Sequence, residues 1–203
     1  MSDELPPLKH YVYESMRTRI DSGFFSKKQV FDALADEIAS AAELAPEAGK
    51  LRGYTAKRWA AREAEERTWR ERTMNDAIDD AFAAMNQAGL VALQNAGWTN
   101  TTGWEDAWDE YRARSERGPA PRGAVFYHYQ SLERGVQGEG LMLNFGCFHE
   151  ADDGDPEGNA RIAAEACRIL AAHGVATRWD GDPGCKIEIP PFVWRRRRFT
   201  AAP

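Results

Sequence analysis

The chain has 203 residues, of which 26 are basic and 32 are acidic, and 43% of its side chains are hydrophobic. This composition excludes a disordered chain, and the net charge of −6 argues against a basic nucleic-acid-binding domain. Three cysteines without close spacing argue against a disulfide framework, and no apolar run approaches the ~20 residues of a membrane-spanning helix. The first residues, 1–7, are acidic and contain prolines, unlike a signal peptide. We therefore expect a cytoplasmic, bacterial-type protein of one domain or one and a half.

Residues 1–88 are predicted to form a helical region. Apolar side chains recur every four residues over 12–20, which indicates one buried helical stripe. Ser26 to Gln29 have the pattern of a capping box, in which the serine and glutamine side chains satisfy free amides at the start of a helix. The helix that begins there ends near Pro46, because proline cannot continue it. The last helix of this region is expected over 78–88.

The third predicted helix, 55–72, has few apolar side chains and many arginines and glutamates. Such a helix buries little of its own surface when it is alone. Its two tryptophans, Trp59 and Trp69, are therefore expected to be exposed and to contact a protein partner or a second copy of the chain.

Residues 89–203 are predicted to form an α+β domain with a basic C-terminal tail. One helix is expected at the capping-box pattern Thr102–Glu105, and another at Asp155-Pro156, where a capping acid precedes a proline. Short apolar or aromatic runs predict strands over 90–93, 124–130, 141–145, 175–179 and 186–189. The order of these elements predicts a ferredoxin-like antiparallel sheet with its helices on one face.

Several short motifs resemble those of a bacterial protein family of unknown function. They are Gln94-Asn95, Val125-Phe126-Tyr127-His128-Tyr129-Gln130, Gly140-Leu141, Phe145-Gly146 and Trp179-Asp180-Gly181. The resemblance extends over about 54–194 and implies no activity, since the family has none assigned. It also implies cysteines just after the Gln-Asn pair, where this chain has Trp98, Thr99 and Thr102. No catalytic residue is therefore transferred from the family.

The first candidate site is the sheet face directed away from the expected helices. Strand alternation is expected to place His128, Asn144, Arg178 and Gln94 on this face. A histidine can transfer a proton near neutral pH, and an arginine can bind a carboxylate or a phosphate group. The alternative, which is the more common situation, is a solvated sheet face on which His128 is hydrogen-bonded locally.

The second candidate is an acidic loop that contains His149, Glu150 and Asp152. Imidazole and carboxylate groups at these intervals could hold a divalent metal ion. The spacing does not match an EF-hand, however. We favour a loop whose carboxylates complement the positive end of the following helix, with Asp155 as the cap.

Aromatic and basic side chains supply two further candidates. Trp104 and Trp108 are one helical turn apart, and Trp98 lies in the preceding loop, where we expect it to be exposed. Tryptophans anchor binding surfaces, although on a helix face they more often belong to the core. The basic candidate is the run of Arg195, Arg196, Arg197 and Arg198. These cations attract phosphates or an acidic protein surface, whereas the alternative is a solvated terminus or one that folds back onto the chain.

The sequence therefore favours a binding or regulatory module with a protein partner or a homodimer, without a cofactor and without nucleic acid. The alternative is an enzyme of hydrolase or transferase type, with His128 as the acid or base and Arg178 as the anion clamp. A deep pocket walled by both side chains would favour the enzyme, and a flat sheet would favour the module. The cysteines are expected to be buried and structural.

Overall fold

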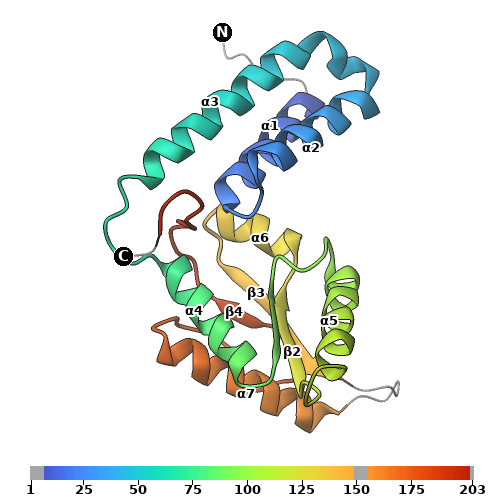
Figure 1. Cartoon of the computed structure of the whole chain (residues 1–203), viewed down its shortest axis with the longest axis vertical. Coiled ribbons are helices and arrows are strands. Elements are labelled where there is room, and N and C mark those ends of the chain that lie inside the picture. Colours follow the sequence, from blue (N-terminus) through green and yellow to red (C-terminus); the bar gives the residue numbers. More distant parts are fainter. Residues whose placement is uncertain (1–6, 149–154, 202–203) are drawn as a thin grey trace. The chain divides into compact units, whose positions relative to one another are not determined.

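The computed structural model describes residues 7–148 and 155–201, which form two compact units (Figure 1). The helical unit comprises Met1–Thr73 and Arg195–Pro203, and the α/β unit comprises Met74–Trp194. The fourth expected helix therefore belongs to the α/β unit, and the basic tail belongs to the helical unit.

The helical unit is built around the apolar stripe that the sequence predicts. Its described elements are α1 (Pro7–Ser22), α2 (Lys27–Ser40), the 3₁₀ helix η1 (Ala42–Glu47) and α3 (Ala48–Glu66). Val12, Met16 and Ile20 are buried in one cluster with apolar side chains of α2, η1 and α3. The capping box of α2 is confirmed, because the backbone N–H of Gln29 donates to Ser26 Oγ and that of Ser26 donates to Gln29 Oε1.

α3 is buried more deeply than its composition suggests. Trp59 is only 5% exposed and lies in the core of the helical unit, so the expectation that it is exposed is wrong. The charged Arg62 is buried because it has partners within the same unit. Its guanidinium donates to the carbonyl of Asp21 at 2.8 Å and lies over the half-buried ring of Trp69 at 4.6 Å. The polar side chains of α3 thus contact their own unit, which hydropathy alone does not predict.

The α/β unit contains a mixed sheet, and its described strands have the order β1-β2-β3-β4. The strands are β1 (Val91–Gln94), β2 (Gly123–Tyr127), β3 (Leu141–Cys147) and β4 (Ile187–Ile189). The helices are α4 (Met74–Gln87), α5 (Asn100–Ser115), α6 (Tyr129–Val136) and α7 (Pro156–Ala172). The predicted α+β class is confirmed. None of the helices in the described part of the chain is long and apolar enough to cross a membrane.

The prediction of an antiparallel, ferredoxin-like sheet is wrong. β1 and β2 are parallel, whereas β3 is antiparallel to both β2 and β4. An antiparallel sheet would need another strand between β1 and β2, because the helix that joins them makes them run in the same direction. Here these two strands pair directly, and β3 adds to the other side of β2. The expected strand over 175–179 is reduced to one bridge between Arg178 and Glu188.

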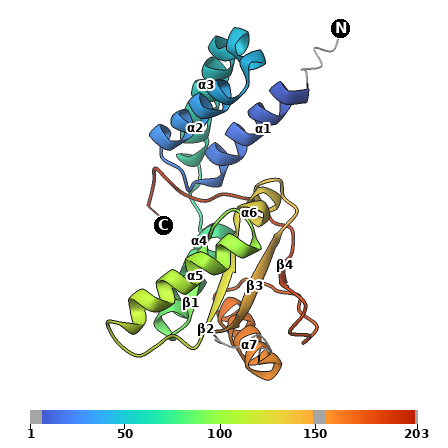
Figure 2. The same cartoon turned by 90° about the vertical axis from the view of Figure 1, so that its right-hand side faces the viewer.

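Helices cover both faces of the sheet, whereas the sequence predicts them on one face (Figures 1 and 2). On one face, the ring of Tyr127 contacts that of Phe82 in α4 at 5.8 Å, and α7 packs beside α4. On the other face, the ring of Phe126 contacts Trp104 of α5 at 5.2 Å. Consecutive strand residues point to opposite faces. These two residues therefore identify an α4/α7 face and an α5 face.

Candidate functional site

The loop after β1 fixes the first turn of α5. Gly97 has a positive φ of 56°, and a Cβ atom there would lie 2.5 Å from the backbone of Thr102, so this position requires glycine. Thr99 caps the helix, and the backbone N–H of Thr99 in turn donates to Thr102 Oγ1 at 2.9 Å. The predicted capping box at Thr102–Glu105 is therefore wrong. The helix begins at Asn100.

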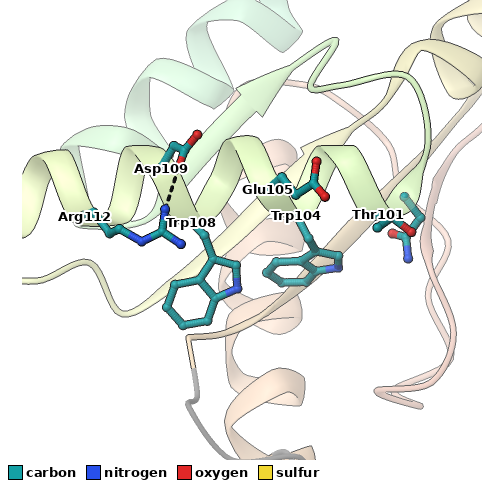
Figure 3. A pocket seen from close by; sticks show the side chains of 7 residues that line it. Thr101, Trp104, Glu105, Trp108, Asp109 and Arg112 are labelled. Carbon is teal, nitrogen blue, oxygen red and sulfur yellow. Dashed lines mark hydrogen bonds and ion pairs between the residues drawn. The ribbon is translucent and has the colours of Figure 1, made fainter.

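Two tryptophans stand one turn apart on the same side of α5 (Figure 3). The ring of Trp108 contacts Phe148 at 4.8 Å, and the ring of Trp104 lies 6.5 Å from it. Phe148 follows β3 and also contacts Tyr111 at 4.4 Å. Because Phe148 supports both indoles, they are half-buried in the unit and present their remaining surface outward.

The two indoles line an open hollow of about 670 Å³. Its polar wall comes from the same helix and consists of Asn100, Thr101, Glu105, Asp109 and Arg112 (Figure 3). Asp109 and Arg112 form an ion pair of 2.5 Å and so compensate each other. Glu105 has no ion pair among the described residues, so its carboxylate leaves a negative charge beside the indoles.

A second hollow of about 210 Å³ continues the first one at the beginning of α5, because both are lined by Asn100 and Trp104. Its other walls come from β3 and from the turn before β4. They are formed by Asn144, Phe145, Pro183, Gly184, Cys185 and Lys186. We call the two hollows together the α5 groove.

The sequence that builds this groove matches a known family. The model of a family described as a domain of unknown function (DUF6891) matches residues 6–198. The chain belongs to the DUF6891 family. No curated protein matches it, and no solved structure does. The expected membership of a family without an assigned activity is thus confirmed.

The four residues of the first sequence-based candidate do not share one face of the DUF6891 sheet. Gln94 accepts a hydrogen bond from Tyr127 Oη at 2.9 Å and donates to Asp79 of α4 at 2.8 Å, so it lies on the α4/α7 face. Asn144 pairs with Phe126 and lies on the α5 face. The prediction that Gln94 joins Asn144 is therefore wrong. Which face of the sheet a side chain occupies relative to side chains of other strands depends on how the strands pair. The alternation of residues within one strand does not reveal this pairing.

Arg178 shares the α5 face with Asn144. It bridges to Glu188, which pairs with Met142, two residues before Asn144. The guanidinium of Arg178 lies 3.6 Å from the Glu188 carboxylate, so its charge is already compensated. Neither hollow of the α5 groove is lined by His128 or Arg178.

His128 flanks the N-terminus of α6 and is 6% exposed. Its Nδ1 atom is buried without a hydrogen-bond partner in the described part of the chain. Burial lowers the pKa of His128, and the positive charge of Lys186 lowers it further. The imidazole is therefore neutral at pH 7.

The acidic-loop candidates His149, Glu150 and Asp152 lie outside the residues that the structure describes. Asp155 is described, and its carboxylate accepts the backbone N–H of Gly158 at 2.8 Å, which confirms it as the cap of α7. Over 7–148 and 155–201, no group of histidine, cysteine and acidic side chains is arranged to hold a metal ion.

The arginine tail contacts the helical unit of this DUF6891 chain. Arg197 donates to the carbonyl of Trp69 at 3.1 Å, and Arg198 donates to that of Ile20 at 2.8 Å. The guanidinium of Arg198 also lies over the ring of Trp59 at 4.4 Å. Two further cation–ring contacts pair Arg195 with Trp69 and Arg196 with Phe24. Of the sequence-based alternatives, a tail that folds back onto the chain describes this arrangement.

The remaining sequence candidates are Trp98 and the cysteines. Trp98 is 45% exposed, as predicted, and its ring stacks on Tyr129 at 4.1 Å. Cys147 and Cys167 are half-buried, and burial raises the pKa of both thiols. Cys185 is exposed, contrary to expectation, and its pKa is raised chiefly by a nearby aspartate. All three thiols are therefore protonated at neutral pH and are poor nucleophiles.

Proposed function

We propose that this protein is a binding module that holds a segment of a protein partner in the α5 groove. The observation that carries the proposal is the pair of indoles, Trp104 and Trp108, which Phe148 supports on the open side of α5. Tryptophan side chains that are already fixed by neighbouring residues supply a large contact area and lose little conformational entropy when a partner binds. Such side chains are typical energetic centres of protein interfaces.

The charge beside the indoles suggests the chemistry of the partner. A cation that lies over an indole face is attracted by the ring, and a carboxylate next to it strengthens its binding. Glu105 supplies this carboxylate, because it has no ion pair within the described residues and lines the same hollow. The segment that fits is therefore one with an arginine or a lysine between apolar residues.

The shape of the groove supports binding rather than catalysis. A catalytic site of the kind that the sequence suggests would be a deep pocket walled by His128 and Arg178. The α5 groove instead opens along the outside of a helix, and neither of these side chains lines it.

A peptide library displayed on phage and selected on the full chain tests this proposal. We expect the selected peptides to contain an arginine or a lysine flanked by apolar residues. Calorimetry with one such synthetic peptide is expected to show at least about ten-fold weaker binding to Trp108→Ala, since that loss corresponds to about 1.4 kcal/mol. Glu105→Gln is expected to weaken binding about three-fold.

Tyr11→Ala is the matched control, because Tyr11 is 54% exposed and lies in the helical unit. It should bind the peptide like the wild type. A selection without a common motif, or a peptide that binds Trp108→Ala and the wild type equally, would contradict the proposal. Elution of the wild type above its mass of 22.8 kDa, reversed by Trp108→Ala, would make a second copy of the chain the occupant.

A further inference from the structure

The second hollow of the α5 groove carries an inference that does not depend on the proposed partner. This hollow lies between the first turn of α5, the middle of β3 and the turn before β4. Its volume is about 210 Å³, compared with about 670 Å³ for the first hollow. It is thus suited to one small group rather than to a large ligand.

The wall at β3 contains a polar side chain without a partner. Asn144 is 7% exposed, and its Nδ2 atom is buried with no hydrogen-bond acceptor in the described part of the chain. A buried amide donor that lacks an acceptor destabilises the fold. An acceptor that enters the hollow would remove this cost, so the site favours a ligand that carries oxygen atoms.

The turn before β4 supplies a positive charge next to Asn144. Leu143 pairs with Ile187, so the next position along brings Lys186 opposite Asn144. Lys186 is exposed, lines the same hollow and forms no ion pair among the described residues. Its charge also reaches His128, whose pKa it lowers.

The first turn of α5 supplies further donors at the same place. Asn100 lines this hollow, and Thr101 follows it in the same turn and lines the first hollow. The backbone amides of both have no acceptor in the described structure, as is usual at a helix start. The positive end of this 16-residue helix attracts negative groups. Two aspartates of the turn before β4, Asp180 and Asp182, also lie near this hollow, and both are engaged within that turn. The carboxylate of Asp182 accepts the N–H of Gly184 at 2.8 Å, and the carboxylate of Asp180 accepts the N–H of Asp182 at 3.0 Å.

We propose that this hollow binds a single oxyanion, a carboxylate or a phosphate group, between Asn144 Nδ2, the ammonium of Lys186 and the first turn of α5. The indole of Trp104 forms the apolar side of the site. The anion has two possible sources, which are a free small molecule and a group carried by a larger ligand in the adjoining hollow.

Titration of the ¹⁵N-labelled chain with inorganic phosphate, and separately with acetate, tests the site by NMR at constant ionic strength. We expect saturable shifts of the Asn144 side-chain amide and of the Asn100 and Thr101 backbone amides. Lys186→Gln is expected to raise the dissociation constant at least about five-fold, and Asn144→Ala to raise it similarly. Lys57→Gln, an exposed lysine of the helical unit, is the matched control and should leave the constant unchanged.

The outcomes are separable. Saturation by phosphate alone supports a free phosphate or a phosphorylated ligand, and saturation by acetate supports a carboxylate. Shifts that grow linearly without saturation, or that weaken equally in Lys186→Gln and Lys57→Gln, would overturn the proposal. Trp108→Ala should bind the anion like the wild type, so failure of the partner site and failure of the anion site are distinguished.

Discussion

At the scale of single residues, Glu66 at the end of α3 binds the backbone of the C-terminal tail. It is 1% exposed, and its Oε1 atom accepts the backbone N–H groups of Arg198, Phe199 and Thr200 at 2.9, 2.6 and 2.7 Å. The Thr200 hydroxyl donates to the same oxygen at 3.0 Å. Three consecutive amides that converge on one carboxylate oxygen hold the backbone of the tail, in addition to the contacts that its arginine side chains make.

Glu66→Ala is expected to lower the free energy of unfolding by about 3 kcal/mol, because it leaves three amides without their charged acceptor. Urea denaturation of the full chain measures this loss. Glu63→Ala is the control on the same helix, since it removes only the exposed ion pair with Arg67 and should cost less than about 1 kcal/mol. Equal losses in the two variants would show that the carboxylate of Glu66 has no special role.

A second prediction at this scale concerns His128. Its pKa in the folded chain lies below the 6.5 of an unfolded chain, so the unfolded state takes up a proton first as the pH falls. This contribution to the free energy of unfolding is therefore complete above pH 6.5 and is lost as the pH falls below it. Urea unfolding at pH 7.5 and 5.5 should show a smaller pH-dependent loss for His128→Gln than for the wild type. His10→Gln, at an exposed position, should behave like the wild type.

At the scale of elements, the start of α5 sets the position of the side chains with which this helix lines the α5 groove. Thr99→Ala removes the side-chain cap and is expected to cost about 1 kcal/mol in the free energy of unfolding. Thr101→Ala, in the same turn and exposed, should change it by less than about 0.5 kcal/mol. Thermal or urea unfolding that ranks the two in the opposite order would refute this assignment of the cap.

The sequence predicts those element boundaries that have a strong local signal. Ser26 with Gln29 and Asp155 with its following proline mark true helix starts. The start of α5 is missed because its capping box uses a second threonine, Thr102, instead of the usual glutamate or glutamine. Local signals of this kind depend on residues a few positions apart, and so the sequence displays them.

Local sequence patterns do not predict strand pairing, because it joins residues that are far apart in the sequence. The parallel pairing of β1 with β2 decides which face Gln94 occupies, and no local pattern reports it. Asn144 is a sequence-based candidate, but Lys186 is not, since only the register of β3 with β4 brings the two together. For the same reason the aromatic signal of Trp104 and Trp108 is visible in the sequence, whereas the groove beside them is not.

At the scale of the molecule, the helical unit draws its residues from both parts of the sequence that flank the α/β unit. Phe199, which is 36% exposed, packs at the edge of its core, with its ring 5.5 Å from that of Trp59. A chain that stops after Trp194 is therefore expected to lose several kcal/mol of stability in this unit, from the lost burial and the unpaired Glu66. Amide hydrogen exchange should show faster exchange in α1 and α3.

A chain that stops after Thr200 is the control, because it keeps the contacts of Phe199 and Glu66. Its exchange in α1 and α3 should match that of the full chain. Protection that survives the removal of everything after Trp194 would mean that the three preceding helices are sufficient by themselves.

The contact between Thr73 and Arg195 has a consequence for how this protein is assembled. The Thr73 hydroxyl donates to the Arg195 carbonyl at 2.9 Å, so the chain leaves the helical unit and re-enters it at adjacent points. That is the topology of a domain inserted into a host. During synthesis on the ribosome the inserted domain emerges complete while its host still lacks a piece. The helical unit therefore completes its fold last. Premature termination of translation before Arg195 would leave the α/β unit with all of its residues and the helical unit without its C-terminal segment.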